Sequence, residues 1–318
     1  MKGLVIKSTG SSYIVRLDDG LDVECHIKGN FRIRGIRSTN PVAVGDFVVV
    51  EDGWITDVHD RQNYIIRRST NLSKESHILA ANIDQVALLV TINHPQTSTT
   101  FIDRFLATCE AYRVRALLIF NKIDLLTEEE LKQLEELRAL YESLGYPTLA
   151  ICAKDLTGEA GITAKRSISK TVCQRSGLLR ELQGCVTLLS GNSGVGKSTL
   201  LNALFGKEMT RTGKISDAHD KGMHTTTFSE MYFLPDGGAV IDTPGIKGFG
   251  SVDMSKEEVG HYFRELFATA KDCRFGNCTH TNEPGCAVQE ALVRGDIAIS
   301  RYESYLSLLG DCTESKYR

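Results

Sequence analysis

The stretch Gly191-Asn-Ser-Gly-Val-Gly-Lys-Ser198 decides the fold, because its glycine spacing and its lysine are typical of a loop that holds phosphates. The apolar run 184–190 before it indicates a buried parallel strand, and the apolar spacing of 198–205 after it indicates a helix. Between a strand and a helix, successive backbone N–H groups face a bound phosphate. Lys197 adds a charge for the β- and γ-phosphate oxygens, and Ser198 offers its hydroxyl to Mg²⁺.

A second motif, Asn121-Lys-Ile-Asp124, follows the apolar run 115–120 and predicts a loop that reads guanine. The Asp124 carboxylate can accept hydrogen bonds from the N1–H and the exocyclic amine of guanine, whereas adenine has no matching pair of donors. An unpaired buried acceptor is costly, so this choice between bases is strong. Lys122 can lay its stem over the base, and Asn121 can tie this loop to the phosphate loop.

The order of the two motifs is inverted, because in an ordinary GTPase the phosphate loop precedes the base-reading motif. The inversion predicts a circularly permuted G domain, which we place at residues 70–250. Between the motifs lies Cys152-Ala-Lys154, where the Ala153 N–H can reach guanine O6. A cysteine stands here in the place of the usual serine.

A third motif, Asp242-Thr-Pro-Gly245, follows a short apolar strand and a predicted β-hairpin that turns at 235–238. Asp242 is placed to hold the hydration shell of Mg²⁺, and the Gly245 N–H is placed to sense the γ-phosphate. Upstream, one threonine of His224-Thr-Thr-Thr227 is the natural switch I ligand, and Thr226 is our candidate. The alternative interpretation of this threonine run is an edge strand.

Catalysis requires a group that orients the attacking water, and Ras-like enzymes use a glutamine after Asp-x-x-Gly. This chain has Ile246 there, which cannot form a hydrogen bond through its side chain. His224 is the best internal substitute, and a histidine that only packs in a loop is the alternative. The catalytic candidates are therefore His224, Lys197 and Thr226.

The predicted nucleotide site combines all three motifs. Its members are Asn121, Lys122, Asp124, Ala153, Gly191, Asn192, Ser193, Gly194, Val195, Gly196, Lys197, Ser198, Thr199, Asp242 and Gly245, with Ser198 on magnesium.

A metal site is predicted near the C-terminus, where three cysteines and one histidine are closely spaced: Cys273, Cys278, His280 and Cys286. Three thiolates and one imidazole suit tetrahedral Zn²⁺, and four protein ligands close its shell. We therefore expect one structural zinc ion per chain. The alternative is an unrelated group of buried cysteines.

The first 68 residues have the texture of a small β-barrel, with short strands separated by turns such as Asp18-Asp-Gly20. Five or six such strands fit an OB-type barrel, a fold that commonly binds RNA. Lys28, Arg32, Arg34 and Arg37 form a basic run, and Phe31 within it could stack on a base. A solvated strand face is the alternative for this run.

Composition agrees with a multidomain protein of 318 residues, of which 42% are hydrophobic. The net charge of −3 gives no global attraction to nucleic acid. No stretch approaches a membrane span, and the N-terminus lacks a signal-peptide profile. An odd number of cysteines, nine, suggests reduced thiols. We expect a cytoplasmic monomer that does not contact a membrane.

Taken together, the barrel, the permuted motif order and the cysteine–histidine group resemble the RsgA family, also called YjeQ or YloQ proteins. The resemblance covers essentially the whole chain. It implies a GTPase that binds GTP and GDP, contacts the 30S ribosomal subunit and its 16S rRNA, and assists late maturation of that subunit. It also implies that the subunit stimulates hydrolysis. Cys152 and Met223 are departures from the family pattern.

The predicted fold is multidomain α/β. It has an OB-fold RNA-binding domain in 1–68, a circularly permuted P-loop GTPase domain in 70–250 and a helical zinc-binding domain in 251–318. In the last domain we expect helices at Ser255–Lys271 and Val288–Leu309, and we interpret Ser69–His77 as a linker.

Two other classes of function stay open at this point. One is a GTP-dependent enzyme that acts on a small molecule. The other is an RNA chaperone whose G domain binds GTP without cycling.

Overall fold

The computed structural model describes residues 1–9, 12–27, 41–68, 76–157, 172–206, 229–243 and 254–314. Several predicted features lie outside these ranges. They are the basic run from Lys28 to Arg37, the switch residues His224 and Thr226, and Gly245 with Ile246. The domain limits also stay predictions, because the chain between the predicted domains falls partly in these gaps. No helix among the described residues is long and apolar enough to cross a bilayer.

Five strands near the N-terminus close into a barrel, which confirms the predicted OB-type fold. They are β1 (Lys2–Ser8), β2 (Tyr13–Leu17), β3 (Asp22–Ile27), β4 (Phe47–Glu51) and β5 (Trp54–Val58). Pairing runs β1-β2-β3-β5-β4 and returns to β1, with β3 and β5 parallel. Alternate side chains, including Val5, Val15 and Val48, fill the barrel interior.

A hairpin of β6 (Tyr64–Arg68) and β7 (Ser76–Ala81) follows the barrel. Ser76 and His77, which we expected in a linker, instead pair with Arg68 and Arg67. Their polar sequence does not predict a strand. The extended conformation here depends on pairing with the other strand of the hairpin.

The G-domain sheet consists of six strands, five of them parallel. They are β8 (Gln85–Val90), β9 (Arg115–Phe120), β10 (Thr148–Ala150), β11 (Val186–Ser190), β12 (Ser229–Phe233) and β13 (Ala239–Asp242). Their order is β10-β9-β8-β11-β13-β12, and only β12 is antiparallel to its neighbour. All six residues of β8 are buried, as expected for a strand covered on both faces.

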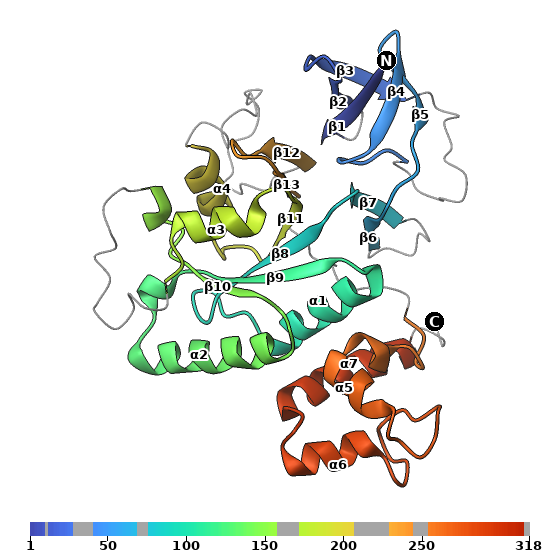
Figure 1. Cartoon of the computed structure of the whole chain (residues 1–318), viewed down its shortest axis with the longest axis vertical. Helices are drawn as coiled ribbons and strands as arrows, with labels where there is room; N and C mark the ends of the chain where they lie inside the picture. Colours follow the sequence, from blue (N-terminus) through green and yellow to red (C-terminus); the bar gives the residue numbers. More distant parts are fainter. Residues whose placement is uncertain are drawn as a thin grey trace.

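Helices cover both faces of the G-domain sheet, so this part of the molecule has three layers (Figure 1). Helices α1 (Thr99–Tyr112) and α2 (Glu128–Ser143) pack on one face, and α3 (Arg175–Leu182) and α4 (Lys197–Phe205) pack on the other. Helix α2 follows the base-reading loop and carries three glutamates in its first turn. It begins with a capping box between Thr127 and Glu130.

The C-terminal part is helical and lies against α1, at the opposite end of the molecule from the barrel (Figure 1). Both long helices predicted here are wrong in extent. The first is a 3₁₀ helix (Val259–Tyr262) followed by α5 (Arg264–Ala270), and the second is α6 (Ala287–Arg294) followed by α7 (Ile299–Glu314). Gly295 separates α6 from α7, because it adopts a left-handed conformation (φ 80°) and its N–H bonds back to α6.

A buried charge network fixes the C-terminal helices to the G domain. Arg301 of α7 donates to Asp103 of α1 at 2.8 Å and to Glu265 of α5 at 2.6 Å, and its side chain is 1% exposed. The same Asp103 carboxylate accepts hydrogen bonds from Ser304 and from Tyr141 of α2. One aspartate therefore connects α1, α2 and α7, and every charge in the group has a partner.

Replacing Arg301 should be costly, because Asp103 would be left buried without its cation. We expect Arg301→Met to lower the free energy of unfolding by about 3–5 kcal/mol, measured by urea denaturation. Arg294→Met is the matched control, since Arg294 pairs with Asp296 on the surface, where both side chains are more than half exposed. Its cost should stay below about 1 kcal/mol. Equal effects of the two changes would contradict this account.

Candidate nucleotide site and metal centre

The loops that carry the predicted nucleotide motifs meet at one edge of the G-domain sheet. The base-reading loop follows β9, the phosphate loop follows β11, and Asp242 ends β13. These strands are parallel, so their carboxyl ends lie side by side, where open α/β sheets bind ligands. A pocket of about 190 Å³ lies between the first two loops, with Asp124, Ala153 and Gly194 in its wall.

The phosphate loop is shaped by glycines in conformations that other residues rarely adopt. Gly191, Gly194 and Gly196 have φ values of 143°, 81° and 102°. A Cβ atom at Gly196 would lie 2.4 Å from the Asn121 side chain, and one at Gly191 would lie 2.5 Å from the Leu89 carbonyl oxygen. Glycine is therefore required both by the turn and by close approach of the neighbouring loops.

The other predicted members of this loop take different positions. Ser198 and Thr199 lie in the first turn of α4, and Ser198 is exposed toward solvent. Asn192 and Ser193 lie in the turn before them. Val195, in contrast, is fully buried in the core beneath the loop, so it can contribute only backbone groups to a ligand.

Lys197 is the first residue of α4, and its side chain lies back over the phosphate loop. Its Nζ donates to the carbonyl oxygens of Gly191 at 2.5 Å and Asn192 at 2.9 Å. Burial lowers the pKa of Lys197, and the nearby carboxylate of Asp242 opposes that change. Asp242 itself is buried, with 7% of it exposed.

Asn121 connects the base-reading loop to the phosphate loop and to the loop after β10, which contains Ala153. Its amide nitrogen donates to the Val195 carbonyl at 2.8 Å, and its amide oxygen accepts from the Ala153 N–H at 2.9 Å. The side chain is 3% exposed. Lys122 has a left-handed backbone (φ 63°), and its ammonium group donates to the carbonyl of His94.

Cys152, in the place of the usual serine, is buried beside two carboxylates. Burial, followed by hydrogen bonds to the carboxylates of Asp124 and Asp155, raises the pKa of its thiol to about 12. The thiol therefore stays protonated at neutral pH. It can orient the carboxylate that is predicted to read guanine.

The loop after β8 also borders the site, although it is not among the predicted nucleotide contacts. The Pro95 ring lies 3.5 Å from where a Cβ on Gly194 would be, and Asn93 donates to Glu130 at 2.8 Å. The His94 carbonyl is also the acceptor for Lys122. No motif marks this segment. Its only signal is its place after a buried strand, at the same sheet edge as the other loops.

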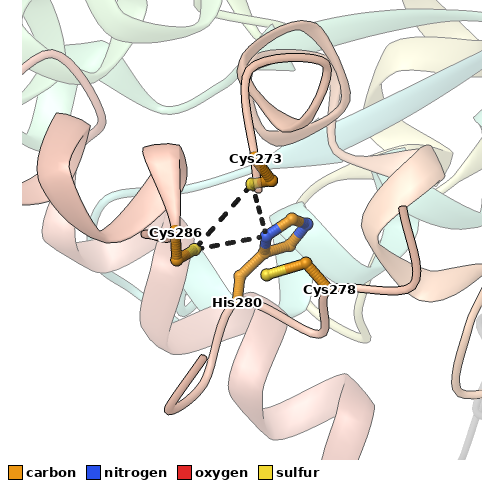
Figure 2. A group of neighbouring side chains, drawn as sticks. All are labelled: Cys273, Cys278, His280 and Cys286. Atoms are coloured by element: carbon orange, nitrogen blue, oxygen red, sulfur yellow. Dashed lines mark hydrogen bonds between the residues drawn. The ribbon is translucent and has the colours of Figure 1, made fainter. Parts of the chain in front are cut away.

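The four predicted metal ligands converge at one point (Figure 2). Their ligand atoms all lie within 4.8 Å of one another. Nδ1 of His280 is 3.6 Å from Sγ of Cys273 and 3.5 Å from Sγ of Cys286, and these two sulfurs are 4.0 Å apart. Ligands about 2.0–2.3 Å from a tetrahedral ion have edges of this length. The group can therefore hold a metal ion.

The metal loop is anchored by polar side chains from the helices around it. Tyr302 donates to the His280 carbonyl at 2.7 Å, and Tyr305 donates to the Thr279 carbonyl at 2.6 Å. Glu283 accepts from the N–H groups of Thr279 and Thr281. Burial alone would raise the pKa of Glu283, but hydrogen bonds from Thr279 and the neighbouring backbone lower it to about 2.

Comparison with known families decides what kind of protein carries this site. The model of the RsgA GTPase matches residues 58–252, and the model of the RsgA N-terminal domain matches residues 2–56. The chain belongs to the RsgA family.

Relatives in this family are similar over their whole length. A protein of Bacteroides fragilis is 58% identical and one of Phocaeicola vulgatus is 55% identical, with 100% of this chain and 99% of each relative aligned. Both bear the name small ribosomal subunit biogenesis GTPase RsgA.

Two solved structures of RsgA-like proteins share the fold. YjeQ from Thermotoga maritima has a TM-score of 0.72 and 31% identity, with 98% of each chain covered. YloQ, described as a circularly permuted GTPase, has a TM-score of 0.71 and 26% identity, with 100% of this chain and 96% of YloQ covered. The predicted family and the predicted permuted GTPase fold are thereby confirmed.

The base-reading assignment can be tested at Asp124. We expect Asp124→Asn to weaken GTP binding about 10- to 100-fold, as roughly 1.5–3 kcal/mol of hydrogen bonding to a charged group is lost. Binding of xanthosine triphosphate should improve in the same variant, because an amide can donate to the O2 of xanthine. Titration with fluorescent nucleotides measures both. Unchanged GTP affinity would remove Asp124 from the site.

Proposed function

We propose that this protein hydrolyses GTP on the small ribosomal subunit and assists the late maturation of that subunit. Binding of GTP is supported by the junction at Asn121, which connects the base-reading loop, the phosphate loop and the loop after β10. The subunit part is supported by full-length similarity to proteins named small ribosomal subunit biogenesis GTPases. A small-molecule enzyme is not favoured by any observation on this site.

Within the cycle, Asp124 would read the base and Lys197 would bind the β- and γ-phosphates. Ser198 and Asp242 would hold Mg²⁺, which neutralises charge on the phosphate oxygens when bound. Both residues lie at the phosphate end of the site, and Asp242 is close enough to Lys197 to influence it. Oxygen donors of this kind suit Mg²⁺.

Thr226, Gly245 and His224 would complete the γ-phosphate end. We assign Thr226 to Mg²⁺ and the γ-phosphate, Gly245 to the γ-phosphate, and His224 to the attacking water. These assignments rest on their positions in the motifs, since all three lie outside the described residues.

We further propose that the metal is a structural Zn²⁺ ion. Three thiolates and an imidazole form the donor set that zinc prefers, and four ligands leave no open position for chemistry. When bound, the ion would cross-link the loop to the start of α6, because Cys286 caps that helix.

The remaining proposals concern partners and location. The barrel would contact 16S rRNA through the basic run from Lys28 to Arg37. We expect a monomer in the cytoplasm, where the relatives' named target, the small ribosomal subunit, is assembled.

A turnover assay with and without purified 30S particles tests the function. We expect slow basal hydrolysis that the particles accelerate, because Ile246 cannot orient the water. His224→Ala should abolish the acceleration while GTP binding and 30S binding persist. Phosphate release measures turnover, and co-sedimentation measures subunit binding.

The Lys197→Ala variant, which should not turn over at all, sets the background of this assay. A small-molecule enzyme would show no dependence on 30S, and an RNA chaperone would bind 30S without turnover. Full acceleration in His224→Ala would mean that ribosomal RNA or another residue positions the water.

The zinc proposal makes a stoichiometric prediction. Protein purified without chelators should contain about one Zn²⁺ per chain, and Cys273→Ser should lose it, because three ligands bind far more weakly than four. Cys312→Ser is the control, since Cys312 lies outside the group. Metal analysis decides between one ion and none. Chelation should loosen the C-terminal helices and leave GTP binding intact.

A further inference from the structure

The barrel extends the G-domain sheet. Strand β1 pairs antiparallel with β12, with Lys7 opposite Glu230 and Ser8 opposite Ser229. In the order of the G-domain sheet, β12 is the last strand, so without β1 it would be an exposed edge. Arg16 of β2 adds a contact, because its guanidinium group lies 4.6 Å from the centre of the Phe233 ring.

The pairing of β1 with β12 lies in the same row across the sheet as Asp242, the predicted magnesium ligand. Glu230 is opposite Lys7 on one side and opposite Asp242 on the other. Residues directly opposite each other point to the same face of a sheet, and adjacent strands are about 4.8 Å apart. Lys7 is therefore about 10 Å from Asp242 across the sheet, with one carboxylate between them.

The charges in this row form two pairs. Lys7 Nζ lies 3.1 Å from the Glu230 carboxylate, and both side chains are about one quarter exposed. At the other end, the Asp242 carboxylate acts on Lys197, because its charge opposes the lowering of the lysine pKa by burial. Glu230 therefore interacts with a lysine of the barrel, and Asp242 interacts with the lysine of the phosphate loop.

Packing around Glu230 holds this arrangement in place. The Tyr232 hydroxyl donates to Glu230 at 3.1 Å, and the Tyr232 ring lies 5.5 Å from the ring of Phe205 at the end of α4. The face that carries Glu230 is therefore the face of the phosphate-loop helix. A change in charge at Glu230 acts on the same side of the sheet as the phosphates.

We propose that Lys7 is a positioning residue for the magnesium–nucleotide complex. It neutralises Glu230 and thereby sets how strongly the Asp242 end of the site attracts Mg²⁺. The barrel gains a direct influence on nucleotide binding, because any movement that withdraws Lys7 leaves the Glu230 carboxylate beside Asp242 without its cation. This inference rests on the proposed GTPase function, since it concerns the affinity of that same site.

Opposite shifts are the signature of this electrostatic link. In the full-length chain, Lys7→Met should lower the Mg²⁺ concentration needed for half-maximal binding of a fluorescent, non-hydrolysable GTP analogue, because Glu230 then attracts the ion. Glu230→Gln should raise it, because Lys7 then repels the ion. We expect shifts of about three- to fivefold, the size that a unit charge and a divalent ion about 10 Å apart give near water.

The double variant restores neutrality and should return to the wild-type value. Lys2→Met is the matched control, because Lys2 is an exposed lysine at the other end of β1. Salt at 1 M should remove most of both shifts, since the screening length falls to about 3 Å. Circular dichroism confirms that each variant is folded.

Two outcomes would overturn the inference. If both single variants shift in the same direction, the pair only holds the barrel in place. If neither shifts, Glu230 does not act on the site. In both cases the wild type still binds magnesium and the analogue, so the proposed function survives. A wild type that binds no analogue at any Mg²⁺ concentration would instead remove the proposed function.

Discussion

The side chain of Asn121 is the constraint on which the nucleotide site depends. Its amide donates to the phosphate loop at Val195 and accepts from the Ala153 N–H, so three loops from different parts of the chain share one buried group. Circular permutation changes the order in which these loops are made but leaves this junction intact. The junction also explains Gly196, because any side chain there would displace the Asn121 amide.

The barrel and the C-terminal helices contact the G domain at two different places. The C-terminal helices bind to α1 through Asp103, whose carboxylate also anchors α2, the helix that follows the base-reading loop. The barrel binds to the other edge through β12 and contributes Ile6 to the main G-domain core. The barrel is therefore continuous with the sheet of the G domain, and the C-terminal helices are continuous with its helical layer.

The sequence was sufficient where a local pattern carries the structure. Strands β9, β11 and β13 lie within the apolar runs that predict them, because such runs are local signals. The metal ligands were found from spacing alone. The sequence was insufficient where a distant partner decides: Ser76 joins a strand through its hairpin partner, and Gly295 interrupts what periodicity alone extends as one helix. The pairing of Lys7 with Glu230 is invisible in sequence, since 223 positions separate them.

The hairpin β12–β13 connects the G domain to both of the parts that flank it. The switch I motif precedes β12 and the Asp-x-x-Gly motif begins at the last residue of β13, so the hairpin joins the two segments that are predicted to contact the γ-phosphate. Its outer strand pairs with the barrel, and the chain beyond its inner strand leads into the C-terminal helices. Here both flanking parts are attached to the hairpin, one by hydrogen bonds and one covalently.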